Sequence, residues 1–253
     1  MRTVEMENSI KIFKSVGELS DFFAQKIAAG IRQTKAGNFY SIALSGGSTP
    51  RKVFEYIALH FKDKTEWQKV LIFWSDERCV DPESDESNYR MARESLLDLV
   101  PIPADHIFRI YGEADPSAEA KRYSEIIRQN VTSRRAVPQF NLMMLGLGDD
   151  GHTVSIFPGN LYLFTSNKLC EVAENPYTKQ KRITLTGKVI NQSKIVVFLV
   201  TGESKAEMVA RIIEKKEGWE KFPAGMVHPE SGELFWLLDV LAANKLNITK
   251  KAK

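Results

Sequence analysis

Cysteine is almost absent from this chain. Among its 253 residues there are two, Cys79 and Cys170, and they stand far apart in the sequence. Two distant cysteines provide neither a disulfide framework nor the paired spacing of a zinc site. We interpret Cys79 as structural, because no base that would activate its thiol is indicated beside it.

An excess of charge of one sign is missing too. The chain has 35 basic and 32 acidic residues and a formal net charge of +3. So small an excess gives no reason to expect nucleic acid or a membrane surface as a partner. The basic stretch at 245–253 is interpreted as a frayed, solvated tail.

Long hydrophobic runs are also absent. No apolar run approaches the roughly 18 residues that span a membrane, and residues 1–5 contain no apolar signal core. We found no internal repeat and no Pro/Gly-rich linker. The sequence therefore predicts a cytoplasmic protein with a single α/β domain spanning residues 1–253.

What the chain does contain is an alternation of apolar strand-like runs with helical patterns. Near-continuous apolar strands separated by helices are typical of a mostly parallel sheet covered on both faces. We therefore predict an α/β, Rossmann-like fold. Strands are expected at 10–13, 40–44, 70–74, 140–145, 182–186, 195–200 and 234–239.

Helices are expected between these strands. One helix is predicted to begin with Thr49 as N-cap and Pro50 at its first position, and another with Asp115 and Pro116. A helix from near Ser87 should turn Leu99 inward. Further helices are predicted over 19–31 and 203–216.

A glycine-rich turn follows the apolar run at 140–145. Its sequence is Gly-Leu-Gly-Asp-Asp-Gly-His at 146–152, so three glycines lie beside two carboxylates and the imidazole of His152. Glycine lets a backbone bend tightly and approach a ligand, and open α/β sheets bind ligands where strands end. A plain surface turn with a solvated Asp pair is the alternative; His60, His106 and His228 lack such a setting.

A second loop suits an anion. Ser45, Gly46, Gly47, Ser48 and Thr49 lie between a predicted strand and a predicted helix, and they offer hydroxyl groups, backbone N–H groups and a helix N-terminus. An ordinary tight turn would also fit. Lys205, in the first turn of the helix predicted at 203–216, and Arg182 could serve the same anion, although each alone also reads as a solvated charge.

Polar residues follow the strand predicted at 70–74 as well. The order Ser75-Asp76-Glu77-Arg78 places Arg78 at the carboxyl edge of the sheet, where its guanidinium could stabilise developing negative charge. Asp76 and Glu77 are expected to orient Arg78. A metal site at Asp149, Asp150 and His152 is conceivable, but it lacks a recognisable ligand spacing.

Taken together, these segments resemble the 6-phosphogluconolactonase family, which is related to the glucosamine-6-phosphate deaminases. The resemblance rests on Leu-Ser-Gly-Gly-Ser-Thr-Pro at 44–50, Ser-Asp-Glu-Arg-Cys-Val at 75–80, Ser-Asn-Tyr at 87–89, the turn at 145–158, Arg-Ile-Thr at 182–184 and Gly-Glu-Ser-Lys at 202–205. It continues to the closing Trp-Leu-Leu-Asp at 236–239. Val154 and Ile156 stand where the family often has Ala and Leu, and 161–181 matches poorly.

The resemblance implies hydrolysis of 6-phospho-D-glucono-1,5-lactone to 6-phosphogluconate in the pentose phosphate pathway, without cofactor or metal. Residues 45–49, Arg182 and Lys205 would bind the phosphate, and His152 would take a proton from attacking water. Asp150 would orient His152 or the water. Arg78 and the N–H groups of Gly148 and Gly151 would lie near the reacting carbonyl.

Two other functions remain open from the sequence. One is a glucosamine-6-phosphate deaminase-type isomerase, but that family has a carboxylate five residues after the histidine, where this chain has Phe157. The other is a non-catalytic sugar-phosphate sensor. A sensor needs the phosphate loop but not His152, Asp150 and Arg78 together.

Overall fold

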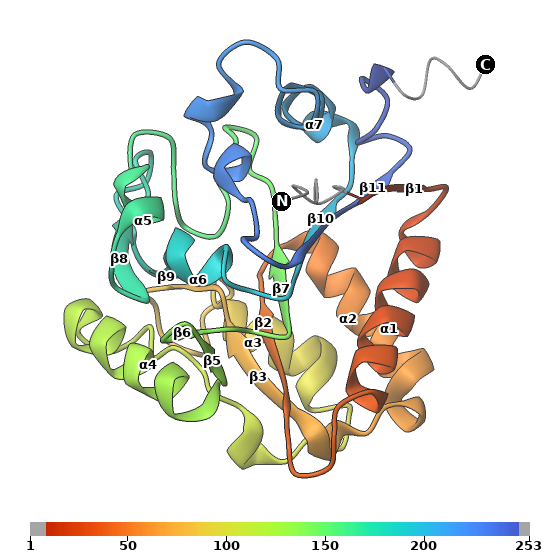
Figure 1. Cartoon of the computed structure of the whole chain (residues 1–253), viewed down its shortest axis with the longest axis vertical. Helices are drawn as coiled ribbons and strands as arrows, with labels where there is room; N and C mark the ends of the chain where they lie inside the picture. Colours follow the sequence, from red (N-terminus) through yellow and green to blue (C-terminus); the bar gives the residue numbers. More distant parts are fainter. Residues whose placement is uncertain (1–8, 248–253) are drawn as a thin grey trace.

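A six-stranded sheet forms the centre of the computed structural model, which describes residues 9–247 (Figure 1). All its neighbouring strands are parallel, in the order β1-β11-β10-β7-β2-β3. Their bounds are β1 Ser9–Phe13, β2 Tyr40–Leu44, β3 Val70–Trp74, β7 Leu142–Leu145, β10 Ile195–Val200 and β11 Glu233–Asp239.

The central strands form where the sequence is mostly apolar. All five residues of β2 and of β3 are buried, as are all four of β7. Such strands must be covered on both faces, because both faces of the sheet present apolar side chains that would otherwise be exposed to water. The predicted fold class, a mostly parallel sheet in an α/β architecture, is confirmed.

Helices cover both faces of the sheet (Figure 1). The helices α1 and α2 pack on one face, where Ile27 of α1, Phe54 of α2 and Ile72 of β3 line one small apolar cavity. The helix α4 packs on the other, where the Tyr123 ring lies 6.4 Å from that of Phe73. The helices are α1 Val16–Arg32, α2 Ser48–Phe61, α3 Asn88–Ala92, α4 Pro116–Asn130, α5 Tyr162–Thr165, α6 Gly187–Ile190 and α7 Ala206–Ile213.

Helix beginnings were predicted with mixed success. Asp115 caps α4 as expected, accepting the N–H of Ala118 at 2.9 Å. The Thr49 cap is wrong: α2 begins at Ser48 with Gly47 as N-cap and no side-chain cap. The Thr49 hydroxyl instead meets that of Thr201 at 2.6 Å.

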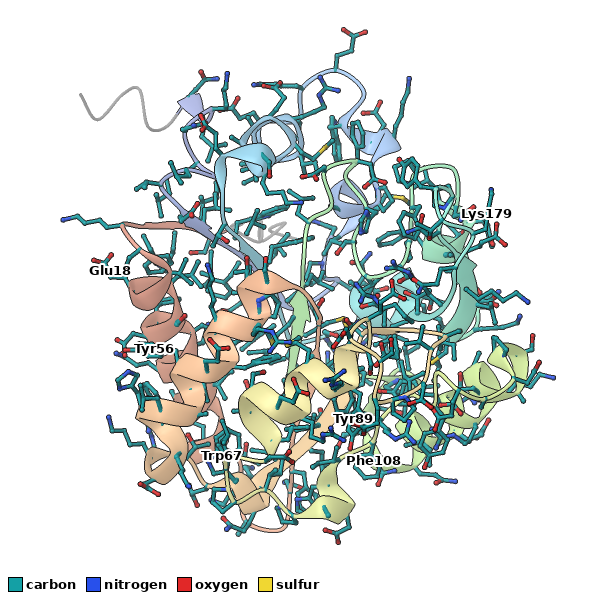
Figure 2. All side chains as sticks on the ribbon, turned by 180° about the vertical axis from the view of Figure 1, so that it is seen from behind. Glu18, Tyr56, Trp67, Tyr89, Phe108 and Lys179 are labelled. Carbon is teal, nitrogen blue, oxygen red and sulfur yellow. The ribbon has the colours of Figure 1, made fainter. Side chains whose placement is uncertain are left out.

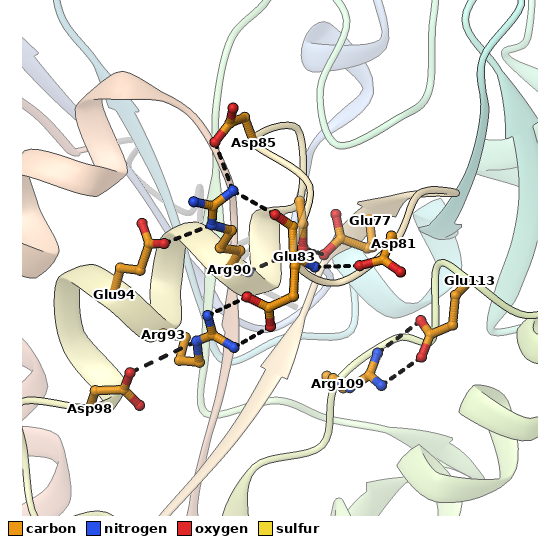
Figure 3. Close-up of polar contacts among 11 residues, drawn as sticks. Glu77, Asp81, Glu83, Asp85, Arg90, Arg93, Glu94, Asp98, Arg109 and Glu113 are labelled. Carbon is orange, nitrogen blue, oxygen red and sulfur yellow. Dashed lines mark hydrogen bonds and ion pairs between the residues drawn. The ribbon is translucent and has the colours of Figure 1, made fainter.

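The predicted helix near Ser87 is shorter and less regular than expected. Ser87 caps α3, but α3 gives way to a π-helical turn at Arg93–Leu97, and Leu99 is 46% exposed rather than inward. Two ion pairs hold the preceding loop against this segment (Figure 3): Glu83 binds Arg93, and Asp85 binds Arg90. A third pair, between Arg90 and Glu94, lies within the segment. This loop leads directly from Arg78.

A separate three-stranded antiparallel sheet was not predicted. It consists of β4 Asp76–Arg78, β9 Lys181–Leu185 and β8 Cys170–Glu174 in the order β4-β9-β8. The strand expected at 182–186 is β9 and therefore lies outside the central sheet. A small hairpin, β5 Ser133–Arg134 with β6 Val137–Pro138, was also missed.

The helix expected over 203–216 is reduced to α7, preceded by a 3-10 turn at Glu203–Lys205. Lys205 is thus the N-cap of α7 rather than part of its first turn. Near the other end, Leu246 is buried and the N–H of Asn247 donates to Glu214. The rest of the tail predicted at 245–253 lies outside the described residues. No helix within 9–247 is long and apolar enough to cross a membrane.

The chain reverses direction across the sheet at one place. β2 is followed outward by β3 on one side, whereas β7, β10 and β11 continue on the other. Such a switch between neighbouring strands leaves a crevice at their carboxyl ends, where α/β proteins bind ligands. The loops after β2, β7 and β10 all open at this edge, and they carry the residues at 45–49, the glycine-rich turn and Lys205.

Candidate active site

The turn at 146–152 is shaped by its glycines. Gly151 has a φ of +78°, and a Cβ on Gly148 would collide with Nδ1 of His152. The N–H of Gly148 donates to the His152 carbonyl at 2.8 Å, and that of Gly151 to the Gly148 carbonyl at 3.0 Å. Both N–H groups are therefore already engaged, which corrects the expectation that they would be free for a substrate oxygen.

His152 and Asp150 form a close pair. Nδ1 of His152 lies 2.5 Å from Oδ1 of Asp150, whose other oxygen, Oδ2, accepts the Tyr177 hydroxyl at 3.1 Å. Burial raises the pKa of Asp150, but the hydrogen bonds and charge of His152 and the hydrogen bond from Tyr177 outweigh it and bring the pKa to about 2. Asp150 is thus a carboxylate at neutral pH. It favours the His152 tautomer with hydrogen on Nδ1, which leaves Nε2 as a base.

Phe157 packs beneath the imidazole. Its ring is buried and its centroid lies 4.5 Å from that of His152. The Arg182 guanidinium carbon lies 5.6 Å from the centroid of the same Phe157 ring. His152 and Arg182 therefore lie against one side chain.

Arg182 on β9 and Arg78 on β4 are directly opposite each other across the antiparallel pair. Like charges in this arrangement repel unless an anion lies between them. The Nε atoms of both side chains are buried without a hydrogen-bond partner. Burial lowers the pKa of Arg182, Asp76 opposes this effect, and Arg78 adds to it. The pair is therefore suited to an anionic or strongly polarised oxygen.

Asp76 and Glu77 were expected to orient Arg78, but their carboxylates bind groups other than the Arg78 guanidinium. Glu77 accepts the backbone N–H groups of Arg78, Asn88 and Tyr89 at 2.7–2.8 Å. Burial raises the pKa of Glu77 although these N–H groups oppose it. Asp76 accepts the Ser155 hydroxyl at 2.7 Å. Glu77 thus fixes the backbone around Arg78, whose Nη1 donates to the Glu86 carbonyl at 2.5 Å.

The loop at 45–49 has the backbone that an anion site needs. Gly47 has a φ of +113°, and a Cβ on Gly46 would collide with Oδ1 of Asn88. Ser45 is buried, whereas Gly47 and Ser48 are exposed at the start of α2. The Thr49–Thr201 hydroxyl contact holds this loop against the loop that follows β10. A helix N-terminus with free N–H groups attracts phosphate.

Lys205 ends the loop after β10. Its Nζ lies 2.7 Å from Oδ1 of Asp149, and the Lys205 side chain is 23% exposed. This ion pair joins the loop to the glycine-rich turn. Contacts through Thr201, Asp149 and Phe157 therefore bring the loop at 45–49, the glycine-rich turn, Lys205 and the two arginines into one region. Lys205 lies nearer the glycine-rich turn, and Arg182 lies beside Arg78.

A family model described as Glucosamine-6-phosphate isomerases/6-phosphogluconolactonase matches residues 14–236. The chain belongs to this family. A 6-phosphogluconolactonase of Treponema pallidum (strain Nichols) is 42% identical over 171 residues, which cover 68% of this chain and 71% of the relative.

Solved structures agree with the family assignment. A 6-phosphogluconolactonase from Trypanosoma brucei has a TM-score of 0.81 at 31% identity and covers 96% of this chain and 100% of that chain. A monomeric glucosamine-6-phosphate deaminase has a TM-score of 0.78 at 22% identity, covering 94% of this chain and 99% of that chain. The second likeness concerns the fold alone.

In this member of the 6-phosphogluconolactonase family, the remaining cysteines and histidines are ordinary. Burial raises the pKa of Cys79 to about 11, so its thiol stays protonated. The His60 ring lies tilted against that of Tyr56, and the His106 ring meets that of Phe39 edge-on. Within the described residues, no three His, Cys, Asp or Glu side chains are grouped to hold a metal.

Sequence reasoning missed two residues of the site. Asn88 fills the space above Gly46, and Tyr177 reaches Asp150 from the tip of the β8–β9 hairpin. Asn88 lies within the quoted Ser-Asn-Tyr motif, which was a usable signal. Tyr177 lies in the poorly matching stretch at 161–181, and the antiparallel pairing that brings it back has no local signature.

Proposed function

We propose that this chain is a 6-phosphogluconolactonase, which hydrolyses 6-phospho-D-glucono-1,5-lactone to 6-phosphogluconate in the pentose phosphate pathway. The observation that carries the proposal is the His152–Asp150 pair, held beside two facing arginines with Phe157 beneath the imidazole. The names of the relatives point to the same reaction. No cofactor or metal has a role in it.

The substrate would be held by its phosphate. The exposed residues at the start of α2 and the Lys205 ammonium offer N–H and cationic donors on neighbouring loops. In the free protein Asp149 pairs with Lys205, and the phosphate would take the place of that carboxylate. Fixing this end of the sugar turns the attack at the far carbonyl into an effectively intramolecular event.

Hydrolysis then requires one base and one anion-stabilising group. Nε2 of His152 removes a proton from water while the water oxygen bonds to the lactone carbonyl carbon. The carbonyl oxygen gains the negative charge and is stabilised by Arg78, with Arg182 beside it. As the ring C–O bond breaks, the imidazolium returns the proton to the departing ring oxygen. Asp150 stays ionised and balances the imidazolium charge throughout.

The decisive experiment compares two reactions on one preparation at neutral pH. Lactone decay is followed with and without the protein and corrected for spontaneous hydrolysis, and ammonia release from glucosamine 6-phosphate is measured in parallel. We expect accelerated lactone hydrolysis and no ammonia. Ammonia release without lactone acceleration would assign the deaminase reaction. No turnover in either assay, with phosphosugar binding retained, would assign a sensor.

A further inference from the structure

The tip of the β8–β9 hairpin reaches back to the His152–Asp150 pair. Asp150 uses both oxygens: Oδ1 faces Nδ1 of His152 at 2.5 Å, and Oδ2 accepts the Tyr177 hydroxyl at 3.1 Å. The three side chains therefore form a chain of two hydrogen bonds. Tyr177 comes from the turn that joins β8 and β9, more than twenty residues further along the sequence than His152.

The hairpin tip is folded so that Tyr177 is presented to Asp150. Oδ1 of Asn175 accepts the N–H groups of Tyr177 and Thr178 at 2.9 and 3.2 Å, and the Asn175 carbonyl accepts the N–H of Lys179 at 2.9 Å. Lys179, labelled in Figure 2 at the outer edge of the molecule, closes the turn with a φ of +61°. This turn is compact although its side chains are exposed.

The same tip is tied to the arginine side of the site. Nε2 of Gln180 donates to Oε2 of Glu86 at 2.8 Å, and the Glu86 carbonyl accepts Nη1 of Arg78 at 2.5 Å. The N–H of Cys79 donates to the Lys181 carbonyl at 3.0 Å. The hairpin tip therefore bridges the two halves of the proposed machinery, the base on one side and Arg78 on the other.

Core packing does not account for the tyrosine. The Tyr177 side chain is 71% exposed, and the neighbouring Asp150 charge raises its pKa, which keeps the hydroxyl protonated as a donor. Oδ1 of Asp150 also accepts the backbone N–H of His152 at 3.1 Å, so His152 supplies two contacts to that one oxygen. The terminal torsion of an aspartate has a broad energy well, so contacts to one oxygen alone leave the carboxylate some rotation. A donor on the second oxygen restricts this rotation and so fixes the direction of the bond to His152.

We propose that Tyr177 is a positioning residue that holds the Asp150 carboxylate, and through it His152, in the orientation needed for proton transfer. This inference rests on the proposed lactonase function. Its consequence is that the hydrogen stays on Nδ1 of neutral His152 and that the Nε2 lone pair points at the attacking water. The hairpin tip then has a role in the rate of the reaction and none in substrate affinity.

The test is Tyr177→Phe in the full chain, with Tyr162→Phe as the matched control. Tyr162 is 61% exposed and lies in the same stretch of sequence, and its backbone carbonyl accepts the Thr165 hydroxyl at 3.1 Å. Steady-state kinetics give kcat and KM for the lactone. The ¹⁵N resonances of neutral His152 report which ring nitrogen carries the hydrogen, independently of any turnover.

We expect Tyr177→Phe to lower kcat about fivefold to tenfold with KM within about twofold, as for the loss of one ordinary hydrogen bond. The Nε2–H tautomer should rise at the same time, and Tyr162→Phe should match the wild type. An unchanged kcat, a rise in KM alone, or a lower kcat with unchanged tautomer would each overturn the inference. If the wild type does not hydrolyse the lactone, the proposed function fails, and the tautomer comparison alone decides whether Tyr177 positions His152.

Discussion

At the scale of single residues, the site depends on Asp150 being ionised and His152 being held. The glycine at 148 admits the imidazole against the backbone, Phe157 supports its lower face, and Asp150 binds Nδ1. Each contact removes a degree of freedom from the proposed base before substrate arrives. Such preorganisation is how a neutral imidazole becomes an efficient proton acceptor at neutral pH.

His152→Ala should therefore lower kcat by about 10²- to 10⁴-fold, the usual contribution of general acid–base catalysis. The fold should persist, because the side chain is 30% exposed and outside the hydrophobic core. Steady-state kinetics and circular dichroism check both points. His228→Ala, at an exposed position, is the control. A folded His152→Ala protein with near-normal kcat would remove His152 from the role of base.

Asp150 also links stability to pH. Its pKa is about 2 in the folded protein against an ordinary value of 3.8, so its ionisation stabilises the fold above pH 4 and this contribution is lost as the pH falls from about 4 towards 2. Asp150→Asn should lower the free energy of unfolding at pH 7 by on the order of 2 kcal/mol at most. The difference from wild type should shrink as the pH falls from about 4 towards 2 in denaturant titrations. A difference that is constant with pH would contradict this, and Asp63→Asn on an exposed turn is the control.

At the scale of elements, the sequence was informative where burial alone decides structure. The strands β3 and β10 were found because apolar residues run through their whole length, and β2 because all its residues but Ser41 are hydrophobic. The sequence could not predict that Arg78 and Arg182 lie opposite each other, because this depends on the register between β4 and β9. Thr49 was misread for a similar reason: its partner Thr201 is distant in the sequence. A local sequence pattern indicates which secondary structure a segment prefers, but it does not indicate which distant residues the segment will contact.

Lys205, on the loop after β10, and Arg182, on β9, have testable roles in binding the substrate. Lys205 and Arg182 are expected to contribute charge-assisted bonds of about 1.5–3 kcal/mol each to anionic groups. Lys205→Ala and Arg182→Ala should each lower kcat/KM at least about tenfold. Inorganic phosphate should inhibit the wild type competitively and inhibit Lys205→Ala more weakly. Lys121→Ala, exposed on α4, is the control. Unchanged kinetics in Lys205→Ala would place the phosphate elsewhere, and unchanged kinetics in Arg182→Ala would remove Arg182 from the stabilisation of the carbonyl oxygen.

At the scale of the whole molecule, the strand order explains why one site collects residues from so much of the chain. β2, β7 and β10 are neighbours in the sheet, so their loops meet at one edge although they are about 50 to 150 residues apart in sequence. The second sheet delivers Arg78, Arg182 and Tyr177 to the same edge. The acid–base group, the arginine pair and the phosphate loop are thus fixed by separate elements of one scaffold.

This arrangement predicts a hydrolase that works without a metal ion. Asp150 is engaged by His152 and Tyr177, Asp149 by Lys205, and Asp76 by Ser155, so the carboxylates near the imidazole already have partners. A divalent ion usually needs several free oxygen or nitrogen ligands converging on one point. Lactone hydrolysis should therefore be unchanged after dialysis against EDTA, and added Mg²⁺ or Zn²⁺ should not raise kcat. Loss of activity in EDTA that a divalent ion restores would make Asp149 or Asp150 a ligand and would replace the acid–base mechanism with a metal-bound hydroxide.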